Sequence, residues 1–340
     1  MKPWLGTCVA AAVTASIPLS GVVAEPPPSA PEYRLGTERT HHKFSAAIPP
    51  VLRVPSGAIV EAFTHEATGG QLALGATAAD LAAVNWDLTH ALTGPVYVEG
   101  ARPGDVLAVT LIEVEAGDWG WTGIWPNEGI LPDGAEAPAI RTYPIDRENA
   151  RIRFSDRITL PLRPFPGVLG VAPATREMLS TTPPRANGGN MYDPNITTGT
   201  TVYFPVFVDG ALFSIGDTHA AQGAGEVGGS AVEAPMRIRF RVEVLRGRPP
   251  LAEPQYENDE IYATTAFATT LDEAAQKATR YMLDYLVVEH GLSRADAYML
   301  CSLACDLRIA QVVNMPHHFV AMHLRKDIFA AAPGLALATR

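Results

Sequence analysis

The stretch MRIRFRVEV, residues 236–244, alternates apolar and charged residues without interruption. A period of two is typical of a half-buried β-strand, with one face on a core and the other in water. The stretch VLAVTLIEV, residues 106–114, alternates less cleanly, with Val106, Ala108, Thr110, Ile112 and Val114 on one face. Both are predicted to be antiparallel strands of a sheet that is covered on one side.

Shorter strands separated by Gly, Pro, Asn and Asp are predicted around these two. They are residues 58–63, 95–98, 150–154, 157–162, 201–208 and 260–265. The 340 residues include 29 glycines and 29 prolines, which favours many turns over a helical bundle. The predicted fold class is therefore mainly β, of the α+β type.

Two helices are predicted near the C-terminus. Residues 269–290 have acidic residues in the first turn, and Gly291 follows the end. Ser293 and Asp296 predict a capping box that starts a second helix, reaching about Val313. Cys301 and Cys305 would share a face of this helix, and we interpret them as small core residues rather than a redox pair.

The N-terminus indicates export. Lys2 precedes an apolar and small-residue run that ends at Ala24, and a proline cluster follows. This predicts a secretory signal peptide at 1–24, with an uncleaved anchor as the alternative. We then expect a proline-rich linker at 25–40, a β-rich catalytic core at 41–265 and a helical segment packed on it at 266–330. The mature protein would be periplasmic or secreted, with no membrane span.

Charge and motifs exclude several function classes. The net charge is −10 and no Lys/Arg cluster is present, so nucleic acid is a poor candidate partner. The sequence has no Cys-x-x-Cys pair, no Gly-x-Ser-x-Gly elbow, and no glycine-rich dinucleotide or phosphate loop.

The densest polar and glycine-rich stretch lies between Asn187 and Glu233. Asp217 and His219 are one residue apart, so in an extended segment or turn both can reach one divalent metal. Glu226 and Glu233 could be further ligands or a general base. The alternative is a surface loop with ordinary polar residues.

Two other groups of residues are weaker candidates. His41 and His42 point to opposite faces if they lie in a strand, so at most one reaches a shared site. Asp87 and His90 could add ligands, or simply belong to a turn before a strand.

Three stretches resemble the acetamidase/formamidase family of amide hydrolases. The first is LTGPVYVEGA (92–101) with PGDVL (103–107). The second runs from GGNM (188–191) through GDTHAAQG (216–223) to Glu226 and Glu233, and the third is DLRIAQVVN (306–314). The resemblance implies a β-sandwich or barrel core with a smaller α/β part. It also implies hydrolysis of short linear amides to a carboxylate and ammonia, by an enzyme commonly oligomeric and holding a divalent metal, zinc or alternatively calcium.

The resemblance also implies roles for individual residues. We expect the metal on His41, Asp217 and His219, and proton transfer by Glu226 or Glu233. Asn190 and Gln222 would bind the substrate amide.

This chain departs from the family pattern. Tyr192 and Ala224 stand where relatives usually carry Asp, and Gly228 where many carry Cys. The competing hypothesis is therefore an extracytoplasmic binding protein of the same fold that has lost catalysis and captures small amides or sugars.

Overall fold

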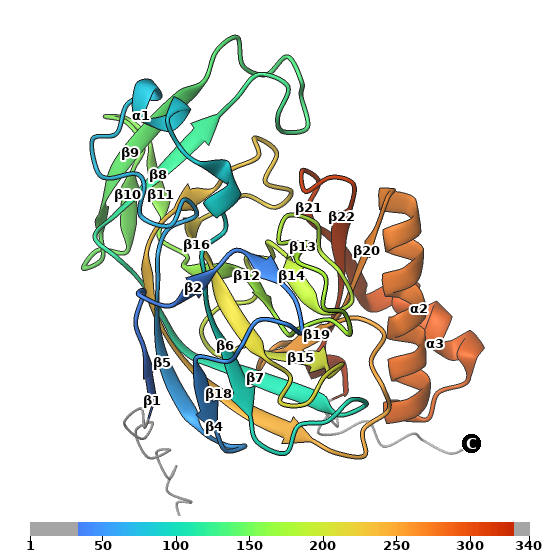
Figure 1. Cartoon of the computed structure of the whole chain (residues 1–340). Coiled ribbons are helices and arrows are strands. Elements are labelled where there is room, and N and C mark those ends of the chain that lie inside the picture. The colour runs from blue at the N-terminus through green and yellow to red at the C-terminus, as the bar shows by residue number, and fades with distance from the viewer. Residues whose placement is uncertain (1–32, 330–340) are drawn as a thin grey trace, which may run out of the picture.

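The structure, a computed structural model, describes residues 33–329 (Figure 1). The predicted signal peptide and the first part of the predicted linker lie outside these residues. Within the predicted linker, β1 (Tyr33–Leu35) pairs in parallel with β5 (Ile59–Thr64), so the sheet begins before residue 41. Among the described residues, no helix combines the length and the apolarity that crossing a bilayer requires.

Two large sheets make up most of the chain. The first has nine strands, in the order β1, β5, β18 (Met236–Leu245), β7 (Val106–Ala116), β15 (Thr201–Pro205), β19 (Gln255–Glu257), β20 (Ile261–Ala268), β22 (His318–Arg325) and β21 (Cys305–Gln311).

The second sheet has eleven strands. Its main path is β11 (Thr159–Pro161), β10 (Arg151–Arg153), β9 (Ala139–Asp146), β8 (Trp119–Ile124), β17 (Val232–Glu233), β16 (Phe213–Ala221), β12 (Phe165–Gly170) and β14 (Gly188–Asn190). From this path β6 (Leu92–Val98) branches off β16 and also pairs with β2 (Thr40–His41) and β4 (Leu52–Val54). A separate pair joins β3 (Lys43–Phe44) to β13 (Leu179–Ser180).

The two large sheets share the main apolar core. Phe213 of β16 packs against Phe240 of β18, with ring centroids 5.3 Å apart. The predicted alternation is confirmed in β18, where Ile238, Phe240 and Val242 are fully buried and the arginines between them are not. The mainly β prediction is confirmed. Neither large sheet closes into a barrel within residues 33–329, so the sandwich alternative holds.

Helix α2 (Leu271–His290) follows the predicted boundaries closely. Thr270 caps its N-terminus by accepting from the backbone N–H of Glu273, and Gly291 ends it with φ +64°. Helix α3 (Arg294–Ala304) begins at the predicted Ser293 cap. The apolar side of α2 packs on β20 and β22, and α3 packs beside it (Figure 1).

The second helix is much shorter than predicted. It ends at Ala304, and residues 305–311 form strand β21, which pairs antiparallel with β22. The hydrogen bonds of that ladder override the helix propensity of Leu, Arg, Ala and Gln in this segment. Cys301 is therefore in a helix and Cys305 in a strand, both as free thiols at the edge of one apolar cluster.

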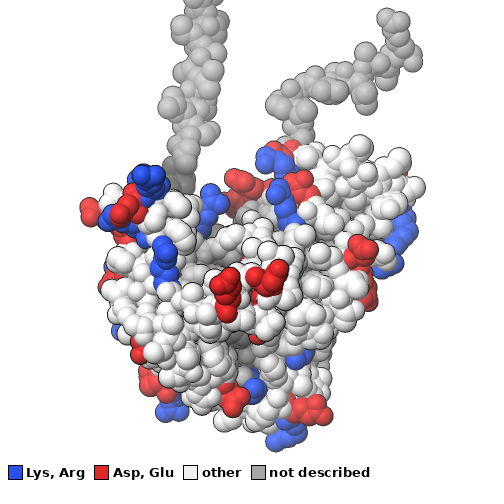
Figure 2. All heavy atoms as spheres, turned by 90° about the horizontal axis from the view of Figure 1, so that it is seen from above, with Lys and Arg blue, Asp and Glu red and all other residues white. Residues whose placement is uncertain are grey.

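Three short helical segments complete the described chain: α1 (Ala78–Ala82) and the 3₁₀ helices η1 (Trp86–Leu88) and η2 (Lys326–Phe329). The face drawn in Figure 2 is mostly uncharged, with acidic and basic side chains scattered over it.

Candidate functional site

Strand β16 supplies the first two side chains of the site. Asp217 and His219 are two residues apart in this strand, so both point to the same face. Both are completely buried. The sequence pattern allowed an extended segment or a turn. The structure places both residues in a strand, in which Asp217 itself has a left-handed backbone conformation with φ +47°.

Strand β17 brings a third side chain beside them. In its antiparallel pairing with β16, Glu233 lies directly opposite His219. Glu233 Oε2 is 3.1 Å from His219 Nε2, and Asp217 Oδ1 is 3.7 Å from the same nitrogen. One donor atom from each residue lies within 4.8 Å of the others. We call Asp217, His219 and Glu233 the triad.

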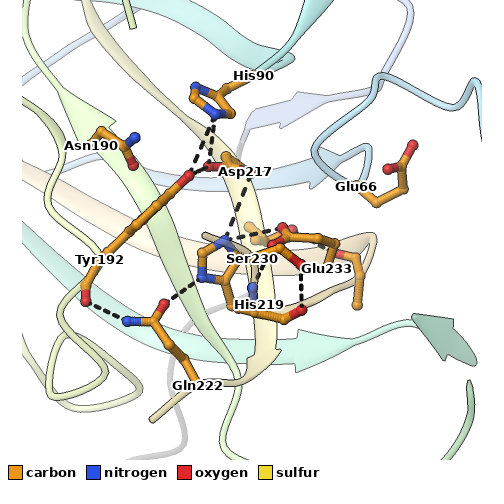
Figure 3. A network of polar contacts seen from close by, with 12 residues as sticks. Glu66, His90, Asn190, Tyr192, Asp217, His219, Gln222, Ser230 and Glu233 are labelled. Carbon is orange, nitrogen blue, oxygen red and sulfur yellow. Dashed lines mark hydrogen bonds and ion pairs between the residues drawn. The ribbon is translucent and has the colours of Figure 1, made fainter. Parts of the chain in front are cut away.

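Each triad residue also has a second polar side-chain atom, and a neighbouring group is hydrogen-bonded to it (Figure 3). His219 Nδ1 donates to Gln222 Oε1 at 2.9 Å, which leaves the lone pair of the neutral ring on Nε2. Tyr192 Oη donates to Asp217 Oδ2 at 2.7 Å. The backbone N–H of Ala231 donates to Glu233 Oε1 at 2.9 Å.

The remaining triad atoms are buried without a hydrogen-bond partner: Asp217 Oδ1, His219 Nε2 and Glu233 Oε2. Buried polar atoms normally have partners, and three orphans that converge on one point require an explanation. A divalent cation would satisfy all three. One imidazole nitrogen with two carboxylate oxygens is a donor set that suits zinc, and the carboxylates also suit calcium. The residues present therefore fit the metal that the family resemblance implied.

Without a cation, the triad carboxylates compete for a proton on His219. Burial lowers the pKa of the His219 ring, but Glu233 and Asp217 raise it well above its ordinary value, so a cation would have to displace a proton from this ring. Burial also raises the pKa of Glu233. Burial opposes the charge of Asp217, but His90, His219 and Tyr192 together lower the pKa of this carboxyl. Burial raises the pKa of Tyr192, and nearby Asp217 raises it further, so the phenol stays protonated and donates its hydrogen bond. Asp217 is thus available as an ionised ligand.

The backbone around the triad is strained. Tyr192, Asp217 and Glu226 have φ of +48°, +47° and +45°, in the left-handed region that residues with a Cβ seldom adopt. Strain of this kind persists where the surrounding structure fixes it, often at functional sites. Gly167 of β12 lies beneath the triad, where a Cβ would come within 2.8 Å of both His219 Cε1 and Tyr192 Cδ1.

A cavity of about 670 Å³ reaches Asp217 and Glu233 of the triad. Its lining includes Asp217, Glu233, His90 and Tyr192. Three tryptophans also line it: Trp86, Trp121 and Trp125. His90 Nε2 is 3.4 Å from Tyr192 Oη and 3.7 Å from Asp217 Oδ2. The site thus joins a candidate cation position, a titratable side chain and room for a small organic molecule.

Comparison with known proteins decides the family. The model of the acetamidase/formamidase family matches residues 31–181 and 174–331. The chain belongs to the acetamidase/formamidase family. The crystal structure of an acetamidase from Bacillus halodurans has a TM-score of 0.82 and 34% identity, covering 87% of this chain and 98% of that one.

Two curated relatives are also similar. An acetamidase of Mycolicibacterium smegmatis is 30% identical over 269 residues, 61% of this chain and 66% of that protein. A putative formamidase of Schizosaccharomyces pombe is 26% identical, with 85% of this chain and 89% of that protein covered.

His41, the remaining residue of the predicted ligand set, is not among the three residues whose donor atoms come together in the described part of the chain. Both of its ring nitrogens are already used, Nδ1 with the carbonyl of Lys43 at 2.7 Å and Nε2 with Ser214 Oγ at 2.8 Å. Glu233, predicted as a catalytic residue, is instead the third member of the group whose donor atoms could hold a cation.

Glu226, the other predicted catalytic residue, lies on the Nδ1 side of His219. Its Oε1 is 4.0 Å from that nitrogen, and neither of its oxygens has a hydrogen-bond partner. Burial raises the pKa of this carboxyl well above its usual range. Glu226 lines a different cavity, of about 240 Å³, together with Ala224.

The predicted substrate-binding residues lie close by. Gln222 uses its amide within the protein: Oε1 accepts from His219, and Nε2 donates to the carbonyl of Tyr192 at 2.8 Å. Asn190 is fully buried; its Nδ2 donates to the carbonyl of Thr182, and its Oδ1 has no partner.

Sequence reasoning gave no role to Tyr192 and only a weak one to His90. The departure from the family pattern at Tyr192 was visible in the sequence, and the structure shows that a hydroxyl bonded to Asp217 occupies that position. The signal for His90 was its place just before the LTGPVYVEGA stretch.

Proposed function

We propose that this chain hydrolyses linear primary amides to a carboxylate and ammonia, with a divalent cation held by Asp217, His219 and Glu233. One observation carries the proposal: three orphaned, buried donor atoms converge where the 670 Å³ cavity reaches the triad. The family relatives named as acetamidases and formamidases support the reaction class.

When bound, the cation would act as a Lewis acid that polarises the amide carbonyl and favours ionisation of water. The chain's own residues prepare this position. Gln222 fixes the tautomer and the ring orientation of His219, while Tyr192 and the Ala231 N–H orient the two carboxylates. Because these partners are in place before the substrate enters, little reorganisation is needed during the reaction.

Proton transfer is assigned to His90. The attacking water loses a proton and the leaving nitrogen must gain one, so a titratable group at the cavity wall is needed. His90 lines the cavity, and its Nδ1 is 3.1 Å from Thr181 Oγ1, which orients the ring. Glu226 does not line this cavity, and Glu233 is committed to the triad.

The test is ammonia release from formamide and acetamide by purified protein, before and after removal of metal with a chelator. We expect release that disappears with the chelator and returns when zinc or calcium is added. Equal activity in the metal-free protein would overturn the role of the cation. No turnover of any linear amide by the metal-loaded protein would instead favour the binding-protein alternative.

Export belongs to the same proposal. Residues 1–24 have the layout of a cleaved signal peptide, which supports a periplasmic or secreted enzyme. Mass spectrometry of the exported chain should find an N-terminus near Glu25, and an intact Met1 would contradict this. The homo-oligomer implied by the resemblance stays a prediction for light scattering to test.

A further inference from the structure

The cavity is far larger than a formamide or acetamide substrate requires. Its volume of about 670 Å³ lies within the range of roughly 300–1,000 Å³ of pockets that bind drug-sized ligands. The smallest amides have almost no acyl group and would leave most of this space to water.

Tryptophans form a continuous aromatic wall of this cavity. The rings of Trp86 and Trp125 meet edge to face with centroids 5.2 Å apart, and Trp121 meets Trp125 in the same way at 6.5 Å. Trp121 is held in place because its Nε1 donates to Glu66 Oε2 at 2.7 Å. Trp86 is 45% exposed, although indole rings are normally well covered. A rigid wall ending in an exposed indole is suited to packing against another ring.

The polar groups around the wall restrict the charge of its ligand. Within residues 33–329, the lining includes the carboxylates of Asp217, Glu233 and Glu128 but neither Lys nor Arg, so an anionic acyl group would find no basic side chain to pair with its charge. Two of these carboxylates belong to the triad, and Glu128 is exposed to water, which screens its charge. Asn314 also lines the cavity, is only 6% exposed, and has an Nδ2 with no hydrogen-bond partner. It offers a donor to an uncharged acceptor.

We propose that the preferred substrates are primary amides with an uncharged aromatic acyl group, whose ring packs on Trp86 and Trp125 while the amide lies beside the triad. This inference rests on the proposed function and narrows its substrate class. It assigns Trp86 and Trp125 to specificity rather than to bond cleavage.

The experiment compares phenylacetamide with acetamide in kcat/KM and, separately, in dissociation constant by calorimetry. Burial of one aromatic ring should favour phenylacetamide about 10–100-fold in the wild-type protein. Trp86→Ala and Trp125→Ala should each lower the phenylacetamide-to-acetamide ratio about 3–10-fold, because about half of the free energy of the ring contact is lost. Tyr298→Ala, which removes an exposed aromatic residue from α3, is the matched control and should leave the ratio unchanged.

Different outcomes separate the two proposals. Turnover of acetamide with no preference for the ring overturns the inference alone. So does a phenylacetamide-to-acetamide ratio that stays at the wild-type value in both tryptophan variants. A tenfold preference for 4-(aminomethyl)phenylacetamide over phenylacetamide would overturn the uncharged class in favour of a cationic one. If neither amide is hydrolysed, the proposed function fails, and the calorimetric ratio still decides whether the cavity selects a ring.

Discussion

Replacing Gln222 by alanine should weaken the cation site although Gln222 is not one of its ligands. The side-chain amide of Gln222 links His219 Nδ1, at 2.9 Å, to the carbonyl of Tyr192, at 2.8 Å. It thereby fixes both a ligand and the residue that orients another ligand. Without it, the His219 ring is free to turn or to move its proton to Nε2, the nitrogen that the cation needs.

The size of the effect follows from the groups left unpaired. His219 is completely buried, so the orphaned Nδ1–H cannot turn to water, and an unsatisfied buried donor costs about 1–3 kcal/mol. At about 1.4 kcal/mol per factor of ten, metal affinity should fall by about 5–150-fold. This agrees with the roughly 10–100-fold typical of residues that orient a metal ligand.

The assay is competition for zinc against a chelator of known affinity, combined with ammonia release at saturating metal. Gln276→Ala, on an exposed part of α2, is the control and should match the wild type. Activity of Gln222→Ala should recover largely when excess metal is supplied. An unchanged metal affinity, with activity lost even at saturating metal, would refute this reasoning and return Gln222 to the substrate-binding role expected from the sequence.

Three further predictions concern single residues. Burial lowers the pKa of His41 to about 4, so the unfolded chain binds more protons below the ordinary value of 6.5 and stability falls as pH drops from about 6.5 to 4. Urea unfolding at pH 7 and at pH 4.5 measures this loss of unfolding free energy, and His41→Gln should make the loss smaller by about 2–3 kcal/mol. An equal loss in the variant and the wild type would contradict the prediction. Glu226→Gln should lower kcat less than tenfold in the ammonia assay. A loss of about 10²–10⁴-fold, the usual cost of removing a general base, would instead support the proton-transfer role expected from the sequence. His90→Gln should lower kcat by about 10²–10⁴-fold with bound metal retained, and near wild-type turnover would remove His90 from proton transfer.

The sequence predicts local features of this fold better than long-range ones. The β18 strand was predictable because its alternation depends only on neighbouring residues, and α2 because its cap and Gly291 lie at its own ends. Strand β21 was not predictable in this way, because its conformation is set by pairing with β22. Its residues taken alone favour a helix.

The same limit applies to the site. Asp217 and His219 were predictable as a pair because two residues of one strand share a face. Glu233 lies beside His219 because of the register between β16 and β17. The number of residues between the two does not specify that register, so the sequence alone could not place them together. The ligand role of His41 was predicted from the family resemblance. In the structure its Nε2 is hydrogen-bonded to Ser214 Oγ, a residue distant in sequence.

The most direct test compares two buried glutamates on opposite sides of His219. Metal content per chain should be measured for the wild type, Glu233→Gln and Glu226→Gln after the same purification and exposure to zinc. We expect one cation per chain in the wild type and in Glu226→Gln, and a large loss in Glu233→Gln. Of the two glutamates, Glu233 is the one with an unpartnered oxygen beside His219 Nε2, at 3.1 Å. Equal metal content in the two variants, or loss in Glu226→Gln alone, would contradict the assignment of the triad as the cation site.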